Sequence, residues 1–214
     1  MIKTKDIDWI FFDVGGTLIN EENSYLKHFE LCEMKLRKNG IQIKKGSYRI
    51  LVEKAYKENK PRPLYNVWRS FTKTEEQPKW YPQNENVFAD TVSTLKYLRG
   101  FYHLGIIANR VPGLEGRLAK NNILDFFETI TSSAEVNVKK PDPMIFQIAL
   151  ENSRSIARRS VYIGDRVDND IVPASKASFK TIRINQGIGK LQRKDKRYPS
   201  YFLIDSLGDL KHIL

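Results

Sequence analysis

Asp13 directly follows an apolar run and is itself followed by Gly15 and Gly16. The apolar run predicts a buried strand, and open parallel sheets bind their ligands just beyond the carboxyl ends of such strands. Glycine has no Cβ, so the chain can turn sharply here and bring backbone N–H groups close to an anion. The stretch therefore predicts a site for an anionic ligand, with a strand-ending turn capped by an aspartate as the plain alternative.

Three further polar stretches contain residues that could join Asp13. Asn109 follows a second apolar run, Lys140 precedes a helical pattern, and Asp165 and Asp170 follow a third apolar run. Each lies at a predicted carboxyl end of a strand or in the loop beyond it, so we expect the side chains to converge on one crevice. Taken singly, each also fits a turn residue, a surface lysine or acids at a helix start.

The elements that must position these residues alternate between strand and helix patterns from about residue 84 onward. Such alternation predicts an α/β fold with a doubly wound, mainly parallel sheet of the Rossmann-like kind. A helix carrying Phe88, Val92, Leu95 and Leu98 is expected to open this region. The predicted strands lie near residues 7–12, 104–108, 129–131, 161–163, 181–184 and 202–204.

Residues 20–83 lack strand patterns and read as a small all-helical unit. Tyr25, Phe29, Cys32 and Leu36 stand at i, i+4, i+7 and i+11, the spacing of one buried helix face. We therefore predict two domains: a core of residues 1–19 and 84–214, and an inserted helical domain of residues 20–83.

The charge balance favours anionic ligands in general. The 214 residues include 36 Lys+Arg against 25 Asp+Glu, a formal charge of +11. The densest basic run, residues 190–197, has no interleaved aromatic side chains that could stack on bases, and a solvated loop is the commoner outcome for such a run. We therefore do not expect nucleic acid as a partner.

The single cysteine, Cys32, excludes an intramolecular disulfide and fits a reducing cytoplasmic location. No apolar signal segment opens the sequence, and no run approaches the roughly 20 apolar residues of a membrane span. We expect a soluble cytoplasmic protein with no membrane partner. No pattern in the sequence indicates an oligomeric state.

In order and spacing, the polar motifs resemble those of the haloacid dehalogenase superfamily. Its four motifs are an Asp-x-Asp-x-Thr after the first strand, a Ser or Thr after the second, a Lys before a helix, and a Gly-Asp followed by a further Asp. The corresponding stretches are 12–18, 107–109, 140–143 and 163–171. The resemblance spans essentially the whole chain and implies a HAD-like core with a helical cap domain of the first type at residues 20–83.

The resemblance implies a Mg²⁺-dependent phosphatase that acts on a small phosphorylated molecule. Asp13 would attack phosphorus and form an aspartyl phosphate, with Asn109 and Lys140 completing the catalytic group. The resemblance also implies that Asp13, Asp165 and the carbonyl of Gly15 bind the metal. It implies that the phosphate is bound by Gly16, Thr17, Asn109 and Lys140. Asp168 and Asp170 would lie further out and orient waters or Lys140.

Two positions depart from the family pattern. Gly15 stands where the family's phosphatases carry a second aspartate as general acid and base, a function worth about 10²- to 10⁴-fold in rate. Asn109 replaces the usual hydroxyl residue but can still donate a hydrogen bond. The sequence therefore predicts intact metal and phosphate binding with reduced or selective turnover.

Two other functions stay open. A module that binds a phosphorylated ligand and no longer turns it over would keep the fold and the site. Hydrolysis of a C–P or C–halogen bond is the third interpretation, since phosphonate hydrolases of this superfamily have a small residue at the position of Gly15 and use a cap lysine. Of the eight lysines between residues 27 and 60, none stands in a distinctive context.

Overall fold

The computed structural model describes residues 6–82, 85–200 and 202–214. Its contacts divide the chain into two compact units, which we name the core unit (Met1–Asn20, Asn86–Lys190 and Lys194–Leu214) and the helical unit (Glu21–Glu85 and Leu191–Arg193). The predicted domain boundary at residues 83 and 84 lies outside the described residues.

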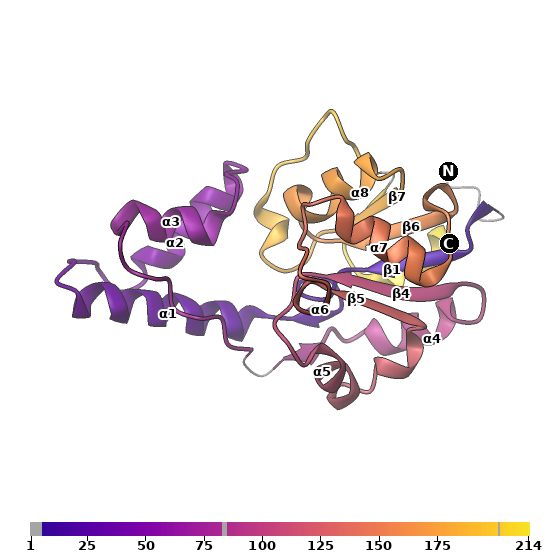
Figure 1. Ribbon diagram of the computed structural model, residues 1–214, viewed down its shortest axis with the longest axis horizontal. Coiled ribbons are helices and arrows are strands. Elements are labelled where there is room, and N and C mark those ends of the chain that lie inside the picture. The colour runs from indigo at the N-terminus through magenta and orange to yellow at the C-terminus, as the bar shows by residue number, and fades with distance from the viewer. Residues whose placement is uncertain (1–5, 83–84, 201) are drawn as a thin grey trace. The chain divides into compact units, whose positions relative to one another are not determined.

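A six-stranded parallel sheet forms the centre of the core unit (Figure 1). Its order is β5 (Thr129–Ser132), β4 (His103–Ala108), β1 (Trp9–Phe12), β6 (Ser160–Gly164), β7 (Lys180–Ile184) and β8 (Phe202–Ile204). Every neighbouring pair runs parallel, with β1 between β4 and β6. This arrangement confirms the predicted doubly wound α/β fold and brings the carboxyl ends of all six strands to one edge.

Helices cover both faces of this sheet, as Figure 1 shows. One face packs on α4 (Thr91–Leu98), α5 (Leu114–Lys120) and α9 (Leu210–Ile213), and the other on α7 (Met144–Ser153) and α8 (Val172–Lys176). The shorter elements of the unit are η2 (Leu124–Phe126), α6 (Ser133–Val136), η3 (Ala157–Arg159), η4 (Val167–Ile171) and η6 (Leu207–Asp209). The turn η5 (Gly189–Leu191) begins in the core unit, and its last residue is assigned to the helical unit.

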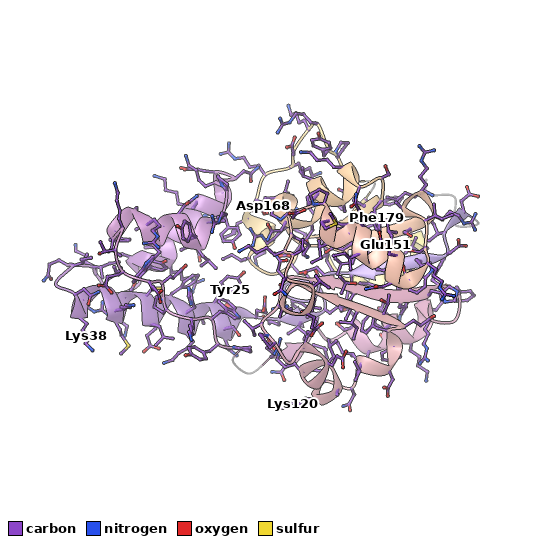
Figure 2. All side chains as sticks on the ribbon, viewed as in Figure 1. Tyr25, Lys38, Lys120, Glu151, Asp168 and Phe179 are labelled. Carbon is purple, nitrogen blue, oxygen red and sulfur yellow. The ribbon has the colours of Figure 1, made fainter. Side chains whose placement is uncertain are left out.

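The α7 side of the core is built around aromatic rings. Phe179, labelled in Figure 2, meets the rings of Phe11 and Phe146 in edge-on contacts with centroids 5.8 Å apart in both pairs. Such contacts add to the burial of apolar area. The buried strand β1, which carries Asp13 at its end, is thereby fixed on this face of the sheet.

The helical unit contains α1 (Glu22–Lys38), α2 (Ser47–Lys57) and α3 (Pro63–Phe71). Phe29, Cys32 and Leu36 of α1 are buried, as their spacing predicts, whereas Tyr25 is half-buried and packs edge-on against Trp80. Residues 191–193 belong to this unit, where the side chain of Asn59 exchanges two hydrogen bonds of 2.9 Å with the backbone of Arg193.

Two details of the chain differ from the expectation. Residues Ile19–Asn20 (β2) and Asn86–Val87 (β3) form a small antiparallel ladder, although the sequence predicts an all-helical segment that includes Asn20. The helix expected to include Phe88 begins only at Thr91, because the Phe88 N–H donates to the Leu18 carbonyl instead of joining a helix. Both differences arise from pairing across the insertion, which no local pattern encodes.

None of the helices in the described parts of the chain is long and apolar enough to cross a membrane. Cys32 is buried as a free thiol.

Candidate active site

Asp13, Lys140 and Asp170 meet at the carboxyl edge of the sheet. The Asp13 N–H donates to the carbonyl of Ile163 in β6, which holds the residue at the end of β1. The ammonium of Lys140 lies 2.6 Å from Asp13 Oδ1 and 2.6 Å from Asp170 Oδ1. The predicted convergence is therefore observed for residues that are 127 and 30 positions apart in the sequence.

Asp165 completes a group of three buried carboxylates. One oxygen each of Asp13, Asp165 and Asp170 can be chosen so that all three lie within 4.8 Å of one another. Burial, and then the negative charges of Asp170 and Asp13, raise the pKa of Asp165 well above its ordinary value. A further cation is the usual way in which a protein offsets such crowding of carboxylates.

The oxygens of these carboxylates differ in the hydrogen bonds that they accept from the protein. Asp170 receives Lys140 on Oδ1 and the Arg166 N–H on Oδ2, at 3.0 Å. Asp165 receives the Gly189 N–H on Oδ2, at 3.0 Å, whereas its buried Oδ1 has no hydrogen-bond partner among the described residues. Asp165, one of the residues expected to bind a metal, therefore offers a buried oxygen that no described residue occupies.

Asp13 is the most accessible member of the group. Its side chain is 11% exposed, against 2% for Lys140 and 1% for Asp170. A nucleophile must be reachable by its substrate, whereas a cation that neutralises charge can be buried. The exposure of Asp13 is thus compatible with the role that the sequence predicts for it.

The side chain of Asn109 binds the backbone of Lys140 at two points. Its Nδ2 donates to the Lys140 carbonyl at 2.8 Å, and its Oδ1 accepts the Lys140 N–H at 2.7 Å. An amide side chain can form this reciprocal pair, and a Ser or Thr hydroxyl cannot reproduce both bonds. In this structure Asn109 therefore fixes the segment that carries Lys140.

Gly16 and Thr17 lie in the turn after Asp13. Gly16 has φ +73°, and a Cβ at this residue would lie 2.6 Å from Asp165 Oδ2, so the close approach of the turn to Asp165 requires glycine. Its N–H donates to the Ile19 carbonyl at 2.8 Å. The Thr17 hydroxyl is buried without a hydrogen-bond partner in the described residues.

Asp168 does not join the cluster. Its two carboxylate oxygens face Arg166, which donates to them from Nε at 3.0 Å and from Nη2 at 2.6 Å. Of the two outer carboxylates predicted from the sequence, the structure places Asp170 against Lys140 and pairs Asp168 with the neighbouring arginine.

Tyr162 is a member of the site that sequence reasoning missed, because it was counted only as part of an apolar strand. Its hydroxyl accepts a hydrogen bond of 2.7 Å from Lys140 and lies 3.0 Å from Asp170 Oδ1 and 2.9 Å from the Ile107 carbonyl. A tyrosine in a buried strand two residues before Gly164 was a usable signal, since a buried phenol needs a hydrogen-bond partner. Burial and the charge of Asp170 raise the pKa of Tyr162, so the phenol stays protonated.

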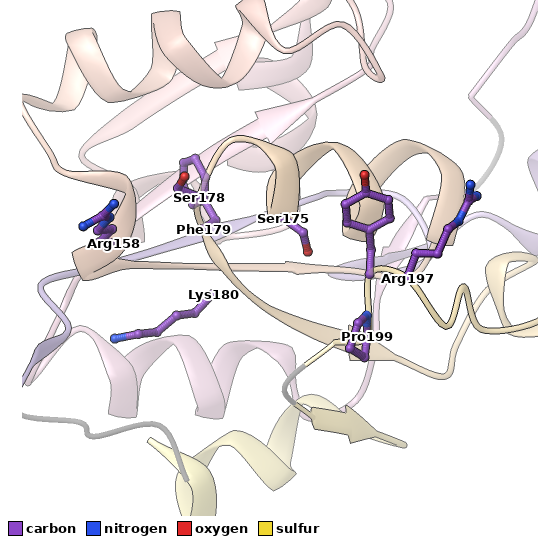
Figure 3. A pocket seen from close by; sticks show the side chains of 8 residues that line it. Arg158, Ser175, Ser178, Phe179, Lys180, Arg197 and Pro199 are labelled. Atoms are coloured by element: carbon purple, nitrogen blue, oxygen red, sulfur yellow. The ribbon is translucent and has the colours of Figure 1, made fainter.

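A separate hollow of about 480 Å³ opens elsewhere on the core unit. Figure 3 shows it lined by basic and hydroxyl side chains, among them Arg158, Lys180 and Arg197. Lys180 begins β7 and Arg158 lies just before β6, so the hollow is at the amino ends of the strands. It is therefore distinct from the carboxylate cluster.

Residues 10–184 match the family model described as haloacid dehalogenase-like hydrolase. The chain is 32% identical over 131 residues to a glyceraldehyde 3-phosphate phosphatase of Methanothermobacter thermautotrophicus, a match that covers 59% of this chain and 58% of that relative. In this match the chain spans little more than half of the relative's length. A protein with the same name from Pyrococcus furiosus is 28% identical over 96% of this chain and 92% of its own.

Among solved structures, a HAD phosphatase from Thermococcus onnurineus superposes with a TM-score of 0.69. It is 23% identical, and the match covers 97% of both chains. At this level of identity the similarity concerns the fold.

Proposed function

This chain belongs to the haloacid dehalogenase-like hydrolase family, and from that premise we propose that it is a magnesium-dependent phosphatase of small phosphorylated molecules. We further propose that it works in the cytoplasm and that residues 20–83 form its cap domain. The observation that carries the proposal is the ammonium of Lys140, which bridges Asp13 and Asp170, in one cluster with Asp165, whose buried Oδ1 has no partner among the described residues.

In the proposed reaction a carboxylate oxygen of Asp13 attacks phosphorus, and the bond between phosphorus and the leaving oxygen breaks. Lys140, held by Asn109, stabilises the negative charge of the phosphoryl group from a fixed position. A water molecule then attacks the aspartyl phosphate, which releases inorganic phosphate and regenerates the carboxylate.

The donor set fits a hard divalent cation. Asp13 and Asp165 supply carboxylate oxygens, one of them buried and without a partner in the described part of the chain, and Gly15 would add a backbone carbonyl. Oxygen ligands of this kind suit Mg²⁺. When bound, Mg²⁺ would offset the repulsion between the attacking carboxylate and the phosphate.

The leaving group needs a proton that Gly15 cannot supply. Substrates with leaving groups of low pKa need little protonation, and a proton can also come from the cap or from the substrate itself. We therefore propose selectivity for acyl or aryl phosphates, or for substrates that carry their own acid. Glyceraldehyde 3-phosphate belongs in any panel because the relatives described above are named for it.

The test measures phosphate release from such a panel, with and without Mg²⁺. Asp13→Asn is expected to reduce release to the uncatalysed rate, because an amide oxygen is a poor nucleophile. The matched control is Asp125→Asn, since Asp125 is an exposed carboxylate in η2. Circular dichroism checks that both variants are folded.

Two results would contradict the phosphatase proposal. Equal release by wild type and Asp13→Asn would remove Asp13 as the nucleophile. Binding of vanadate with Mg²⁺, but no turnover of any substrate, would favour the phospholigand-binding module instead.

A further inference from the structure

Arg183 is a buried cation that none of the roles described so far uses. It lies in β7, opposite Gly164 of β6, and is 4% exposed. Burying a guanidinium is costly unless it is hydrogen-bonded and placed near opposite charge. The partners of Arg183 therefore indicate why it is there.

Two of these partners belong to the surroundings of Asp165. Arg183 Nη2 donates to the Gly189 carbonyl at 2.8 Å, and its Nε donates to the backbone carbonyl of Asp165 at 3.3 Å. One planar guanidinium thus connects the residue that carries the free carboxylate oxygen to the loop after β7. A lysine cannot form both bonds with the same geometry, since its ammonium is a single point.

The loop after β7 contacts Asp165 through its backbone. The Gly189 N–H donates to Asp165 Oδ2 at 3.0 Å, so the carbonyl and the N–H of Gly189 bind Arg183 and Asp165 respectively. A Cβ at Gly189 would lie 2.6 Å from the Asp165 carbonyl oxygen, closer than real Cβ contacts. Only glycine allows this approach.

We propose that Arg183 is a positioning residue for Asp165: it holds Gly189 in place, Gly189 occupies Oδ2, and Oδ1 is left fixed and free to bind the metal. This role rests on the proposed magnesium site. Partners that orient a metal ligand in this way are typically worth about 10- to 100-fold in metal affinity.

Whether Mg²⁺ binding becomes weaker or tighter when Arg183 is replaced distinguishes a positioning role from a purely electrostatic one. If Arg183 acted on the site only as a cation, replacing it by a neutral residue would relieve repulsion and tighten Mg²⁺ binding. If it positions Asp165, the same replacement weakens Mg²⁺ binding, because the carboxylate loses its fixed orientation.

The experiment is calorimetric titration of Mg²⁺ into the full-length protein, without substrate. Arg183→Met is expected to raise the dissociation constant by about 10- to 100-fold. Arg183→Lys keeps the charge but loses the two-point contact, and is expected to give a smaller increase. Arg158→Met, at the amino ends of the strands, is the matched control and is expected to bind Mg²⁺ as the wild type does.

Gly189→Ala provides a second route if Arg183→Met does not fold. Its methyl group would displace the loop from Asp165 while Arg183 stays in place, and it is expected to weaken Mg²⁺ binding in the same range. Unchanged or tighter Mg²⁺ binding in the folded variants would overturn the role of Arg183. Absence of Mg²⁺ binding in the wild type would instead overturn the proposed metal site, and this role with it.

Discussion

At the residue scale, Lys140 donates a hydrogen bond to each of three partners inside the protein: Asp13, Asp170 and Tyr162. Burial by itself would lower the pKa of Lys140, but the charges of Asp13 and Asp170 outweigh it and raise the pKa above its ordinary value. The ammonium is therefore charged at physiological pH. A phosphoryl oxygen that enters the site would compete with Asp13 for one of the hydrogens of the Lys140 ammonium.

Gly15 carries the first prediction at this scale. Gly15→Asp is expected to raise turnover of alkyl phosphates by about 10²- to 10⁴-fold, because it restores a general acid where one is missing. Gly15 is not among the described glycines with positive φ, so its φ does not by itself exclude an aspartate. The measurement is kcat for alkyl and aryl phosphates, with the smaller gain expected for aryl leaving groups.

Gly15→Asn is the control for this prediction. Asparagine has nearly the size and shape of aspartate but no carboxyl proton to transfer. If folded Gly15→Asp is no faster than Gly15→Asn, then the site is not simply a phosphatase that lacks its acid.

At the element scale, the short π-helical turn η4 decides which acids reach the site. The Arg166 carbonyl accepts N–H groups from both Asp170 and Ile171, at 3.0 and 3.1 Å. This wide turn brings Asp170 back to Lys140 and leaves Asp168 beside Arg166. Single π-helical turns are rare and often mark functional sites.

Helix α1 contains a histidine that makes the stability of the helical unit depend on pH. His28 is 4% exposed, and burial lowers its pKa to about 4. The folded state therefore binds a proton less readily than the unfolded state, in which the pKa is near 6.5. The associated stability is present above pH 6.5 and is lost as the pH falls toward 4, by about 3 kcal/mol in total.

Urea denaturation followed by tryptophan fluorescence, to which the buried Trp68 of the helical unit contributes, measures this loss between pH 7 and pH 4. His28→Leu is expected to flatten the pH dependence, since it removes the titrating group. The matched control is His103→Gln, which replaces an exposed histidine of the core unit that pairs with Glu128. An unchanged slope in His28→Leu would show that another group is responsible.

At the scale of the whole molecule, the candidate site and the insertion occupy different units. Asp13, Lys140, Asp165 and Asp170 all belong to the core unit, whereas residues 21–85 form most of the helical unit. The chain leaves the core unit after Asn20 and returns to it at Asn86, and these two residues are paired with each other in the antiparallel ladder of β2 and β3. The core sheet is thus continuous without the inserted residues.

Replacing residues 21–85 by an Asn-Gly turn is therefore expected to give a folded core unit. Two-residue turns of this type join paired antiparallel strands, and Asn20 and Asn86 are such a pair. The shortened protein is expected to unfold cooperatively in urea and to bind Mg²⁺ with the affinity of the wild type, while it loses discrimination among phosphorylated substrates. A protein that is unfolded at neutral pH, or that binds no Mg²⁺ when the full chain does, would contradict this.

Local patterns in the sequence were sufficient for the six strands of the core sheet and for the long helix α1, but not for the ladder of β2 and β3. Apolar runs predict β1, β4 and β6, and a buried helical face predicts α1, because burial imposes periods that a single segment displays. The same patterns place Asp13 and Asp165 at strand ends. Parallel pairing then brings those ends to one edge, so a shared crevice follows from topology alone.

The sequence by itself therefore determined the fold class, the edge of the sheet at which the candidate site lies, and the gathering of Asp13, Asp165 and Asp170 with Lys140 at that edge. The tertiary structure alone decided that Asn109 clamps the backbone of Lys140, that Tyr162 takes one of its hydrogen bonds, and that Arg183 reaches the surroundings of Asp165. The physical reason is that these contacts join residues from different strands and loops. They depend on register and on the direction of each side chain, which no periodic pattern along the chain records.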